Sequence, residues 1–499
     1  MLKLKPKRIE ITTGNKWIAV LQQNNADKLD LHPGDRIELT AGKGKNKKIV
    51  NAILEISDDG NGIGDKNIGL FSETWNRLGV KKGDIVNVGL CPKPLSTIYI
   101  REKLTGQHLD YKKIDFIIRD VVQEDLSDVE IAYFVAGCFI HGLNDQETID
   151  LTRSIVRNGS RLNFGKGKIV LDKHCIGGVP GNRTTMLIIP ICTSLGLTMP
   201  KTSSRAITSP SGTADTMETL AEVAIPADKL MKIAKKVGGF IAWGGGVDLA
   251  AADDKMIKAR HPLSLDPEGM LLASIMAKKF SAGSNHVLID IPVGEQVKIS
   301  NKKDGDCLKK RFEQIGKKLG MKVKVILTDG EEPIGKGIGP ALEAIDVMNS
   351  LQGTPDASRD LREKACEMAG MLLEMCGKAK VGKGYNMAKE QLESGAAYRQ
   401  MVKIIEAQGK KTLYPKLSKL KHAVKALKSG SVKYINNALI ARIARVAGAP
   451  KNAGAGMWLD KKLGDKVKKG EVLYTVYADG QEALERALTF TNDGVYKIG

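Results

Sequence analysis

Two stretches rich in glycine and hydroxyl side chains contain the residues whose types and spacing suggest chemistry. The first, DKHCIGGVPGNRTT (residues 172–185), places a lysine before three glycines and two threonines. The second, SSRAITSPSGTADTMETL (residues 203–220), carries a run of serines and threonines and one arginine ahead of a predicted helix. Hydroxyl groups, backbone N–H groups exposed by glycine and helix N-termini all bind phosphate. Either stretch alone could be a capped loop, but two in one domain favour a phosphate site.

A third stretch, ARHPLSLDPEGMLLASIMAKKFSAG (residues 259–283), adds an acid. Asp266 directly precedes Pro267, the pattern of a helix start. Asp266, Met270, Ser274 and Lys278 then follow at steps of four, so a helix places them along one face. A carboxylate, a hydroxyl and an ammonium on one stripe could contact one ligand; a capping Asp with a solvated Lys is the simpler alternative.

Two further glycine motifs do not support a nucleotide-binding loop. GEEPIGKG (residues 330–337) nearly matches the phosphate loop of NTPases, but it lacks the Ser or Thr after Lys336 that holds magnesium, so this function is rejected. GKGIGPALEA (residues 335–344) is better explained as a turn in which two backbone segments approach closely.

The elements around these stretches predict a multidomain α/β and α+β protein. LHPGDRIEL (residues 31–39) and VKKGDIVNV (residues 80–88) repeat one turn-and-strand pattern, which predicts a small β-rich, barrel-like domain over residues 1–90; two unrelated hairpins are the alternative. Helical periodicity predicts a helical domain over residues 91–165, completed by about 252–285. Alternating strands and helices predict a large α/β phosphate-binding domain with a mixed sheet over residues 166–420. Residues 421–499 predict a small, β-rich α+β domain at the C-terminus.

Composition limits the kinds of binding partner and the cellular compartment that we expect for this protein. The 499 residues carry a formal net charge of +20, which favours anionic partners, but aromatic residues make up only 5%, which argues against a nucleic-acid surface built on stacking. Seven cysteines without a C-x-x-C pair signal neither zinc nor disulfides and are typical of a reducing cytoplasm. The N-terminus lacks an apolar leader, and the most apolar run, MLIIPICTSLGL, is too short to span a membrane. We therefore expect a cytoplasmic protein with no cofactor, no metal and no membrane or nucleic-acid partner.

Several motifs together resemble one known family. DKHCIGGV, SSRAITSPSGTADTMETL, SIMAKKFSAG and LTDGEEPIGKGIGPALEA occur in that order, followed by LGDKVKKGEVLYTV near the C-terminus. From about residue 104 onward they resemble the thymidine/pyrimidine nucleoside phosphorylase family. The additional N-terminal segment and ITSPSGTADTMETL resemble its archaeal-type branch, the AMP phosphorylases.

The resemblance implies an activity and an assembly. The activity is phosphorolysis of nucleoside 5′-monophosphates (AMP, and also CMP and UMP) with inorganic phosphate to free base and ribose 1,5-bisphosphate, a pentosyltransferase reaction of nucleotide salvage and degradation. The family pairs through its helical domain, so a homodimer or higher homo-oligomer is expected.

The resemblance also implies roles for individual residues. The implied phosphate ligands are Lys173, Ser203 and Thr184, and the implied nucleotide contacts are Gly178, Ser204, Arg205, Ala206, Ile207, Thr208, Ser209, Thr213, Ser274 and Lys298. Asp266 is the implied proton donor, with His174 as the next candidate. Cys175 stands where the nucleoside enzymes carry serine, and Arg260 matches a base-contacting arginine; their roles, and that of Lys278, stay open.

Three alternatives remain. A thymidine/pyrimidine nucleoside phosphorylase differs only in whether the 5′ position carries phosphate, and Arg205 in the hydroxyl-rich loop favours the phosphorylated substrate. A phosphoribosyltransferase of the anthranilate type has a similar layout of helices and α/β domain, but it would need an acidic magnesium–pyrophosphate site, which the sequence does not show near the loops. A basic nucleic-acid-binding protein is the non-enzymatic alternative.

Overall fold

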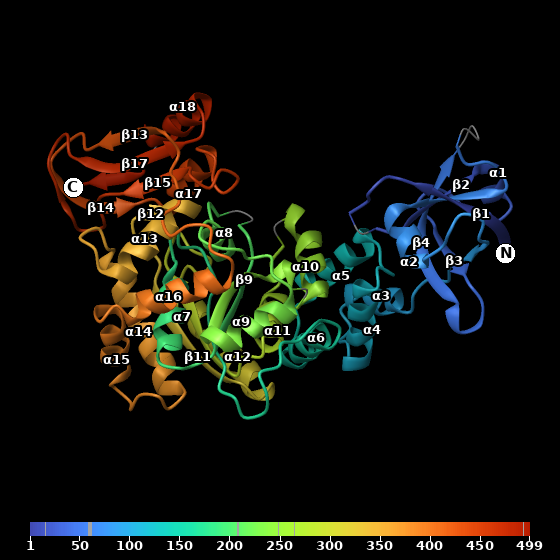
Figure 1. Ribbon diagram of the computed structural model, residues 1–499, viewed down its shortest axis with the longest axis horizontal. Coiled ribbons are helices and arrows are strands. Elements are labelled where there is room, and N and C mark those ends of the chain that lie inside the picture. The colour runs from blue at the N-terminus through green and yellow to red at the C-terminus, as the bar shows by residue number, and fades with distance from the viewer. Residues whose placement is uncertain (15, 58–61, 207–208, 248, 264, 493) are drawn as a thin grey trace. The chain divides into compact units, whose positions relative to one another are not determined.

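The computed structural model describes residues 1–499 except 15, 58–61, 207–208, 248, 264 and 493 (Figure 1). Its contacts divide the chain into two compact units. The first unit contains residues 1–142 and 255–267, and the second contains residues 143–254 and 268–499.

The first unit begins with a closed barrel, drawn in blue in Figure 1. Neighbouring strands pair around it in the order β1-β5-β2-β4-β3-β6. Alternate side chains point inward, and Leu21, Leu39 and Leu54 are fully buried in the barrel core. The predicted barrel-like domain is therefore confirmed. Its strands are β1 (Leu2–Ile9), β2 (Ile18–Gln22), β3 (Arg36–Ala41), β4 (Lys48–Ser57), β5 (Asn67–Phe71) and β6 (Val86–Leu90), with helices α1 (Gln23–Asp27), η1 (Gly44–Asn46) and α2 (Ser72–Leu78) between them.

The barrel is built from two equivalent halves. Exchanging β1, β2 and β3 for β4, β5 and β6 leaves every strand pairing unchanged: β1–β5 and β2–β4 are parallel, and β1–β6 and β3–β4 are antiparallel. The two repeated sequence patterns form the same turn, in which an Asp side chain accepts a backbone N–H three residues earlier. Asp35 accepts from His32 at 2.7 Å, and Asp84 accepts from Lys81 at 2.8 Å. The repeat seen in the sequence is thus a structural repeat.

Helices complete the first unit. Ser127 and Glu130 form a capping box at the start of α5, and Gly142 caps the end of that helix. Lys16 of the barrel contacts Asp128 at 2.6 Å. The helices are α3 (Ser96–Leu104), α4 (Tyr111–Val122), α5 (Asp128–His141), the last part of α10 (Ala251–Arg260) and η3 (His261–Leu263).

A parallel sheet forms the centre of the second unit. Strand β10 pairs in parallel with β7 and with β11, β8 pairs in parallel with β9, and a parallel bridge between Val170 and Thr198 joins the two groups. Helical segments separate successive strands, so each strand can return to the same end of the sheet. The predicted mixed sheet is therefore wrong for these pairs, which are all parallel. The strands are β7 (Leu171–Cys175), β8 (Met199–Ser203), β9 (Gly239–Trp243), β10 (His286–Val293) and β11 (Lys322–Asp329).

Helix α7 is the core helix of this unit. The apolar run MLIIPICTSLGL forms most of it, and its side chains are buried against α14 and α16, which come much later in the chain (Figure 1). The helices in this part of the unit, α7 included, are α6 (Asp145–Arg157), α7 (Thr184–Ser194), α8 (Thr213–Glu218), α9 (Ala227–Val237), η2 (Gly244–Gly246), α11 (Glu268–Ser281), α12 (Lys302–Lys318), α13 (Pro340–Gln352), α14 (Arg359–Met375), α15 (Gly384–Glu393) and α16 (Ala396–Ala407).

The C-terminal region adds two small antiparallel sheets, β12-β15-β17-β13 and β16-β14-β18. Their elements are β12 (Gly337–Ile338), β13 (Leu420–Lys425), β14 (Gly430–Ile435), α17 (Asn437–Val446), β15 (Gly456–Leu459), β16 (Lys466–Val467), β17 (Val472–Ala478), α18 (Gln481–Thr489), η4 (Phe490–Asn492) and β18 (Tyr496–Ile498).

One strand of these sheets comes from the middle of the chain. Strand β12 follows the GEEPIGKG loop but pairs with β15. Gly339 has a φ of +114°, and a Cβ there would collide with the carbonyl oxygen of Ala455, so the predicted close-approach turn is confirmed. On its other side, the same loop bonds to the first glycine stretch, since Ile334 N donates to Pro180 O at 3.1 Å.

Among the described residues, no helix has the length and apolar character needed to cross a membrane.

Candidate active site

A cavity opens where β7, β8 and β9 end. Its volume is about 460 Å³, and residues that follow each of these strands line it. The carboxyl ends of parallel strands are where loops converge to form ligand sites in α/β folds. The lining residues are Lys173, His174, Cys175, Gly177, Gly178, Val179, Asn182, Arg183, Thr185, Lys201, Thr202, Ser203, Ser204, Ser209, Ser211, Thr213, Trp243, Gly244, Gly245, Leu249, Ala250, Asp254, Ser274, Ile275, Lys278 and Lys279. The structure thus brings both predicted phosphate stretches to one cavity.

Lys173 lies on β7, and its side chain is fully buried at the cavity wall. Its Nζ is 3.2 Å from Asp290 Oδ2 on β10 and donates to Thr184 Oγ1 at 2.9 Å. Burial alone would raise the pKa of Asp290, but Lys173, Lys364 and a hydrogen bond from Thr328 more than offset it and keep that pKa below its usual value. The ion pair fixes the Lys173 ammonium in place, with a remaining N–H available to a ligand.

Two more lysines stand beside Lys173. Lys279 Nζ lies 2.7 Å from Asp172 Oδ2, and Lys201 Nζ lies 3.5 Å from Asp172 Oδ1. Sequence analysis missed Lys201, Lys279 and the two carboxylates that hold them. The available signal was a lysine within a short buried strand, PKTSS, because a buried lysine needs a partner or a ligand.

The hydroxyl-rich stretch after β8 contributes side-chain donors. Ser203, Ser204, Ser209 and Thr213 line the cavity, as expected. Two of the backbone N–H groups expected to be free are already occupied, since Ala206 N and Gly212 N both donate to Asp215 Oδ2, at 2.7 and 2.8 Å. Hydroxyl groups are therefore the main donors that this loop offers. Two of its predicted contact residues, Ile207 and Thr208, lie outside the described residues.

Arg205 does not line the cavity. Its guanidinium pairs with Glu218, where Nη2 donates to Oε1 at 2.8 Å, and lies 3.5 Å from Asp215. It also stacks over the Trp243 ring, with Cζ 5.0 Å from the ring centroid. The hydrogen bond that Arg205 donates to Glu218 raises the pKa of Arg205, so its charge is compensated within the protein. The expectation that Arg205 favours a substrate phosphate is therefore not supported by its contacts.

Thr184, the implied phosphate ligand, does not line the cavity, whereas its neighbour Thr185 does. Thr184 is fully buried behind the wall, where its hydroxyl accepts from Lys173 and donates to Asn182 Oδ1 at 2.8 Å. Thr185 lines the cavity instead. In the described structure, Thr184 orients Lys173, and Thr185 is the threonine that a ligand could reach.

Gly178 and Lys298 belong to two loops that touch. Gly178 has a φ of +103°, and a Cβ there would press on the backbone of residues 297 and 298. Gly178 lines the cavity, whereas Lys298 is not among the lining residues. The glycine lets the second loop lie against the phosphate stretch.

Ser274 and Lys278 lie on α11 and share a partner on α10. Ser274 Oγ donates to Asp253 Oδ2 at 2.7 Å, and Lys278 Nζ lies 2.7 Å from the same oxygen and 3.5 Å from Asp254 Oδ1. Burial would lower the pKa of Lys278, but the two carboxylates more than offset it and raise that pKa. Lys278 therefore stays charged.

Asp266 and Arg260 lie in the first unit and are not among the residues that line the cavity. Arg260 Nη1 is 3.3 Å from Asp266 Oδ1. Helix α11 begins at Glu268, two residues after Asp266, so the sequence placed the start of this helix correctly to within two residues.

His174 and Cys175 line the cavity without being suited to proton transfer at neutral pH. Burial, reinforced by Lys279, Lys201 and Lys173, lowers the pKa of His174 well below 6.5, so its ring is neutral. Burial and Asp290 raise the pKa of Cys175 to about 11, so it remains a thiol. The hypothesis that His174 replaces Asp266 as the proton donor is weakened, because a neutral imidazole is a much weaker acid than an imidazolium.

Arg183 ties three loops together at the back of the cavity. Its Nε lies 2.5 Å from Glu343 Oε2 on α13, and its Nη2 donates to Ser211 O at 2.6 Å. Glu343 is almost fully buried and also accepts from Thr216 Oγ1 at 2.7 Å and from Gly339 N. Neither residue was predicted, since the pair joins positions 160 residues apart.

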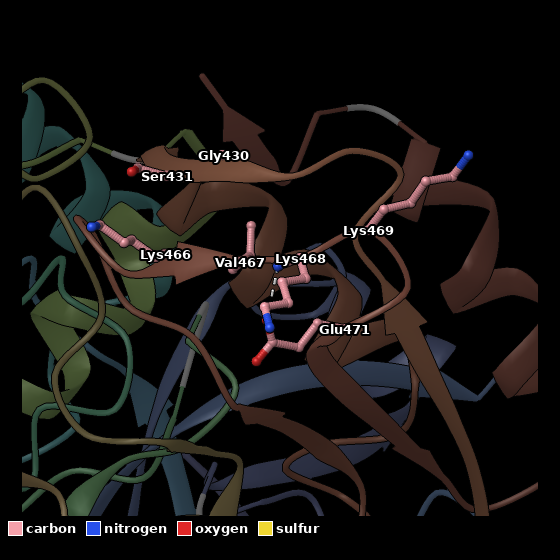
Figure 2. A pocket seen from close by; sticks show the side chains of 7 residues that line it. All are labelled: Gly430, Ser431, Lys466, Val467, Lys468, Lys469 and Glu471. Atoms are coloured by element: carbon pink, nitrogen blue, oxygen red, sulfur yellow. Dashed lines mark hydrogen bonds between the residues drawn. The ribbon is translucent and has the colours of Figure 1, made fainter.

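Another hollow, of about 710 Å³, lies beside β14 and β16 (Figure 2). It is lined by Gly430, Ser431, Lys466, Val467, Lys468, Lys469 and Glu471. Figure 2 shows Lys466 and Lys469 pointing in opposite directions, and Glu471 Oε1 is held by Lys461 at 2.5 Å. Its charged groups do not converge on one point, so it lacks the geometry of a binding site.

Comparison with known proteins places the chain in a family. Three family models match: the helical bundle domain of a glycosyl transferase family at residues 97–159, the a/b domain of that family at 167–398, and the pyrimidine nucleoside phosphorylase C-terminal domain at 431–495. The chain is thus a glycosyl transferase in domain composition.

Individual relatives narrow the class of glycosyl transferase to which the chain belongs. A protein of Bradyrhizobium diazoefficiens named "Putative thymidine phosphorylase" is 44% identical over 481 residues, which cover 96% of this chain and 93% of that protein. A protein of Legionella pneumophila with the same name is 44% identical over 426 residues, covering 85% and 82%. The chain belongs to the thymidine/pyrimidine nucleoside phosphorylase family.

A solved structure supports the fold. Anthranilate phosphoribosyltransferase of Thermus thermophilus superposes with a TM-score of 0.52 at 17% identity, over 62% of this chain and 98% of that one. At this identity the likeness concerns the fold alone.

The Arg183–Glu343 pair generates a prediction. Replacing Glu343 with Gln leaves a mostly buried guanidinium without its counter-charge, so we expect a loss of roughly 3 kcal/mol in stability and at least about a fivefold loss in phosphate affinity. Thermal unfolding and calorimetric titration with phosphate measure the two effects. Glu363→Gln removes an exposed partner of Arg359 and should change neither. Unchanged phosphate affinity in Glu343→Gln would show that the pair does not position the loops.

Proposed function

We propose that the chain catalyses phosphorolysis of a pyrimidine nucleoside such as thymidine, releasing the base and forming a sugar 1-phosphate. The observation that carries this proposal is the lysine group of the cavity, which consists of the buried Lys173, Lys201 and Lys279. The hydroxyl groups of Ser203, Ser204 and Thr213 line the same cavity. These are groups that bind inorganic phosphate. Family membership and the printed names of the relatives support the nucleoside as the second substrate.

The proposed mechanism depends on positioning and charge. Breaking the bond between C1′ and the base nitrogen develops positive charge on the sugar and negative charge on the base. Phosphate held by Lys173 beside C1′ serves both as nucleophile and as counter-charge, while the fixed lysines lower the cost of gathering the reactants. The departing base gains a proton, for which Asp266 is the proposed donor. In this role Asp266 acts as the carboxylic acid and is left as the carboxylate, which takes up a proton from solvent before the next turnover.

A second candidate is phosphorolysis of nucleoside 5′-monophosphates (AMP, CMP or UMP) to base and ribose 1,5-bisphosphate. The observation that favours it is the presence of two sets of phosphate-binding groups in one cavity, the lysines at β7 and the hydroxyl loop after β8. One set would hold the attacking phosphate and the other the 5′-phosphate. The internal pairing of Arg205 counts against it, because that charge is already compensated.

A substrate panel tests the two candidates. Thymidine, uridine, AMP, CMP and UMP are each incubated with inorganic phosphate, and free base is measured. We expect phosphate-dependent release from the nucleosides, lost in Lys173→Met. A kcat/KM at least about tenfold higher for the monophosphates would replace the first candidate by the second. No release from any of the five would overturn both.

The role proposed for Asp266 gives a separate prediction. Asp266→Asn keeps the shape of the side chain but removes its proton, so kcat should fall by about 10²- to 10⁴-fold while the KM for phosphate changes little. Glu55→Gln, at an exposed barrel position, is the control. Near wild-type turnover in Asp266→Asn would rule out Asp266 as the acid.

We also propose that the chain forms a homo-oligomer through its helical region. Val129, Tyr133 and Ile140 are exposed along one face of α5, with Ile98 exposed on the neighbouring helix α3. Apolar patches of this kind on a surface mark contact sites. We propose a second copy of the chain as the occupant, in line with the expectation that the family pairs through its helical domain.

Tyr133→Glu tests this proposal. A charge in the centre of an apolar contact should shift the protein towards monomer by at least about tenfold in dissociation constant, measured by analytical ultracentrifugation. Val381→Glu, at an exposed position of the second unit, should have no effect. A wild-type protein that sediments as a monomer, or a Tyr133→Glu variant that still pairs, would contradict it.

A further inference from the structure

Lys201 is the member of the lysine group with the weakest ionic contact. Its side chain is 7% exposed, it lines the cavity, and its Nζ donates to the backbone carbonyl of Lys173 at 2.8 Å. Its distance to Asp172 is 3.5 Å, compared with 2.7 Å for Lys279 to Asp172 and 3.2 Å for Lys173 to Asp290. The nearer lysines take most of the available negative charge.

The charges around Lys201 do not balance. Strand β7 contributes Asp172, Lys173 and the neutral His174, strand β10 contributes Asp290, and α11 contributes Lys279. Lys278 of α11 is paired with Asp253 and Asp254 of α10, so those carboxylates are used there. Lys364 also lies close to Asp290 and adds positive charge. Lys173, Lys201 and Lys279 therefore share two carboxylates.

A buried excess of positive charge can be relieved in two ways: one lysine gives up its proton, or an anion enters. Burial lowers the pKa of Lys201 to about 7; Asp172 opposes this shift, and Lys279 and Lys173 reinforce it. With no anion beside it, Lys201 is thus expected to lose its proton near neutral pH. An anion beside Lys201 supplies negative charge and so favours the protonated form of the side chain.

We propose that Lys201 is a further anion-binding residue that takes up a proton from solvent when phosphate enters the cavity. The inference rests on the proposed function, because it takes phosphate as the ligand of this cavity. The step is a simple protonation: the lone pair of Lys201 Nζ binds a proton released by the buffer, and the ammonium then donates to the phosphate oxygens. No other bond changes.

This proposal fixes how affinity depends on pH. The anion binds the protonated form, so the pKa of Lys201 is higher in the complex than in the free protein. Affinity is full below about pH 7 and falls above it, by up to about tenfold per pH unit until the pKa of the complex is reached. If Lys201 stayed charged throughout this pH range, the affinity for the anion would not fall in this way.

Calorimetric titration with inorganic sulfate tests the proposal. Sulfate has the shape and charge of phosphate but does not itself titrate between pH 6 and 8.5. Titrations in buffers of different ionisation enthalpy give the number of protons taken up. We expect uptake approaching about one proton per sulfate near pH 8 and little near pH 6. His174, with its lowered pKa, does not contribute at pH 8.

Two variants separate the role of Lys201 from a structural one. Lys201→Arg keeps a permanent charge, so it should bind sulfate without proton uptake and without the pH slope. Lys201→Met should bind sulfate about tenfold more weakly at pH 6, also without uptake. Lys235→Met, at an exposed lysine on α9, should behave as wild type. The Arg variant suffices if the Met variant does not fold.

The outcomes distinguish this inference from the proposed function. Sulfate binding without proton uptake in the wild type, or uptake that persists in Lys201→Arg, overturns the role of Lys201 and leaves phosphorolysis intact. Absence of binding by both sulfate and phosphate at every pH overturns the anion site, and the proposed function with it.

Discussion

Buried positive charge beneath one cavity is the constraint on which the candidate site depends. Lys173 on β7, Lys201 on β8 and Lys279 on α11 share Asp172 and Asp290. Charges removed from water need compensation, and an incomplete set of partners leaves part of that requirement to a ligand. The two arginines of the loops do not add to this excess, because Arg183 is paired with Glu343 and Arg205 with Glu218. The lysines therefore form the cationic wall, and the hydroxyls complete it.

Carboxylate side chains also fix the loops by accepting hydrogen bonds from their backbone amides. Asp215 accepts the amides of Ala206 and Gly212, and Asp346 accepts those of Lys336 and Gly337. Groups that looked like free phosphate donors in the sequence are thus bonded within the protein. The result is a set of loops fixed before a ligand arrives, which is what a site acting by position and electrostatics requires.

Local patterns predicted the parts of the structure that local physics determines. The barrel repeat and the convergence of Lys173, Ser203 and Thr213 follow from turns and strand–loop–helix order, which are visible over a few residues. The parts that were missed join distant segments: Arg183 with Glu343, or Lys201 with Asp172. The exchange of Thr184 for Thr185 shows the limit at single-residue scale, since a one-residue step along a helix start turns a side chain from the cavity into the wall. Two positions of the hydroxyl loop, 207 and 208, lie outside the described residues, so their predicted contacts stay predictions.

The loop before β12 connects the cavity to the C-terminal sheet through backbone hydrogen bonds at both of its ends. At one end Ile334 bonds to Pro180, beside the glycines of the cavity, and at the other Gly337 and Ile338 form an outer strand of the C-terminal sheet. Peptide groups cannot change rotamer or be shortened by substitution, so these two backbone contacts do not depend on the identity of the loop side chains that make them. Excising the C-terminal residues would strip that strand of its neighbour and release the anchor of the glycine loop. The C-terminal sheet thus supports the glycine loop of the cavity, so removing the sheet would also change the site.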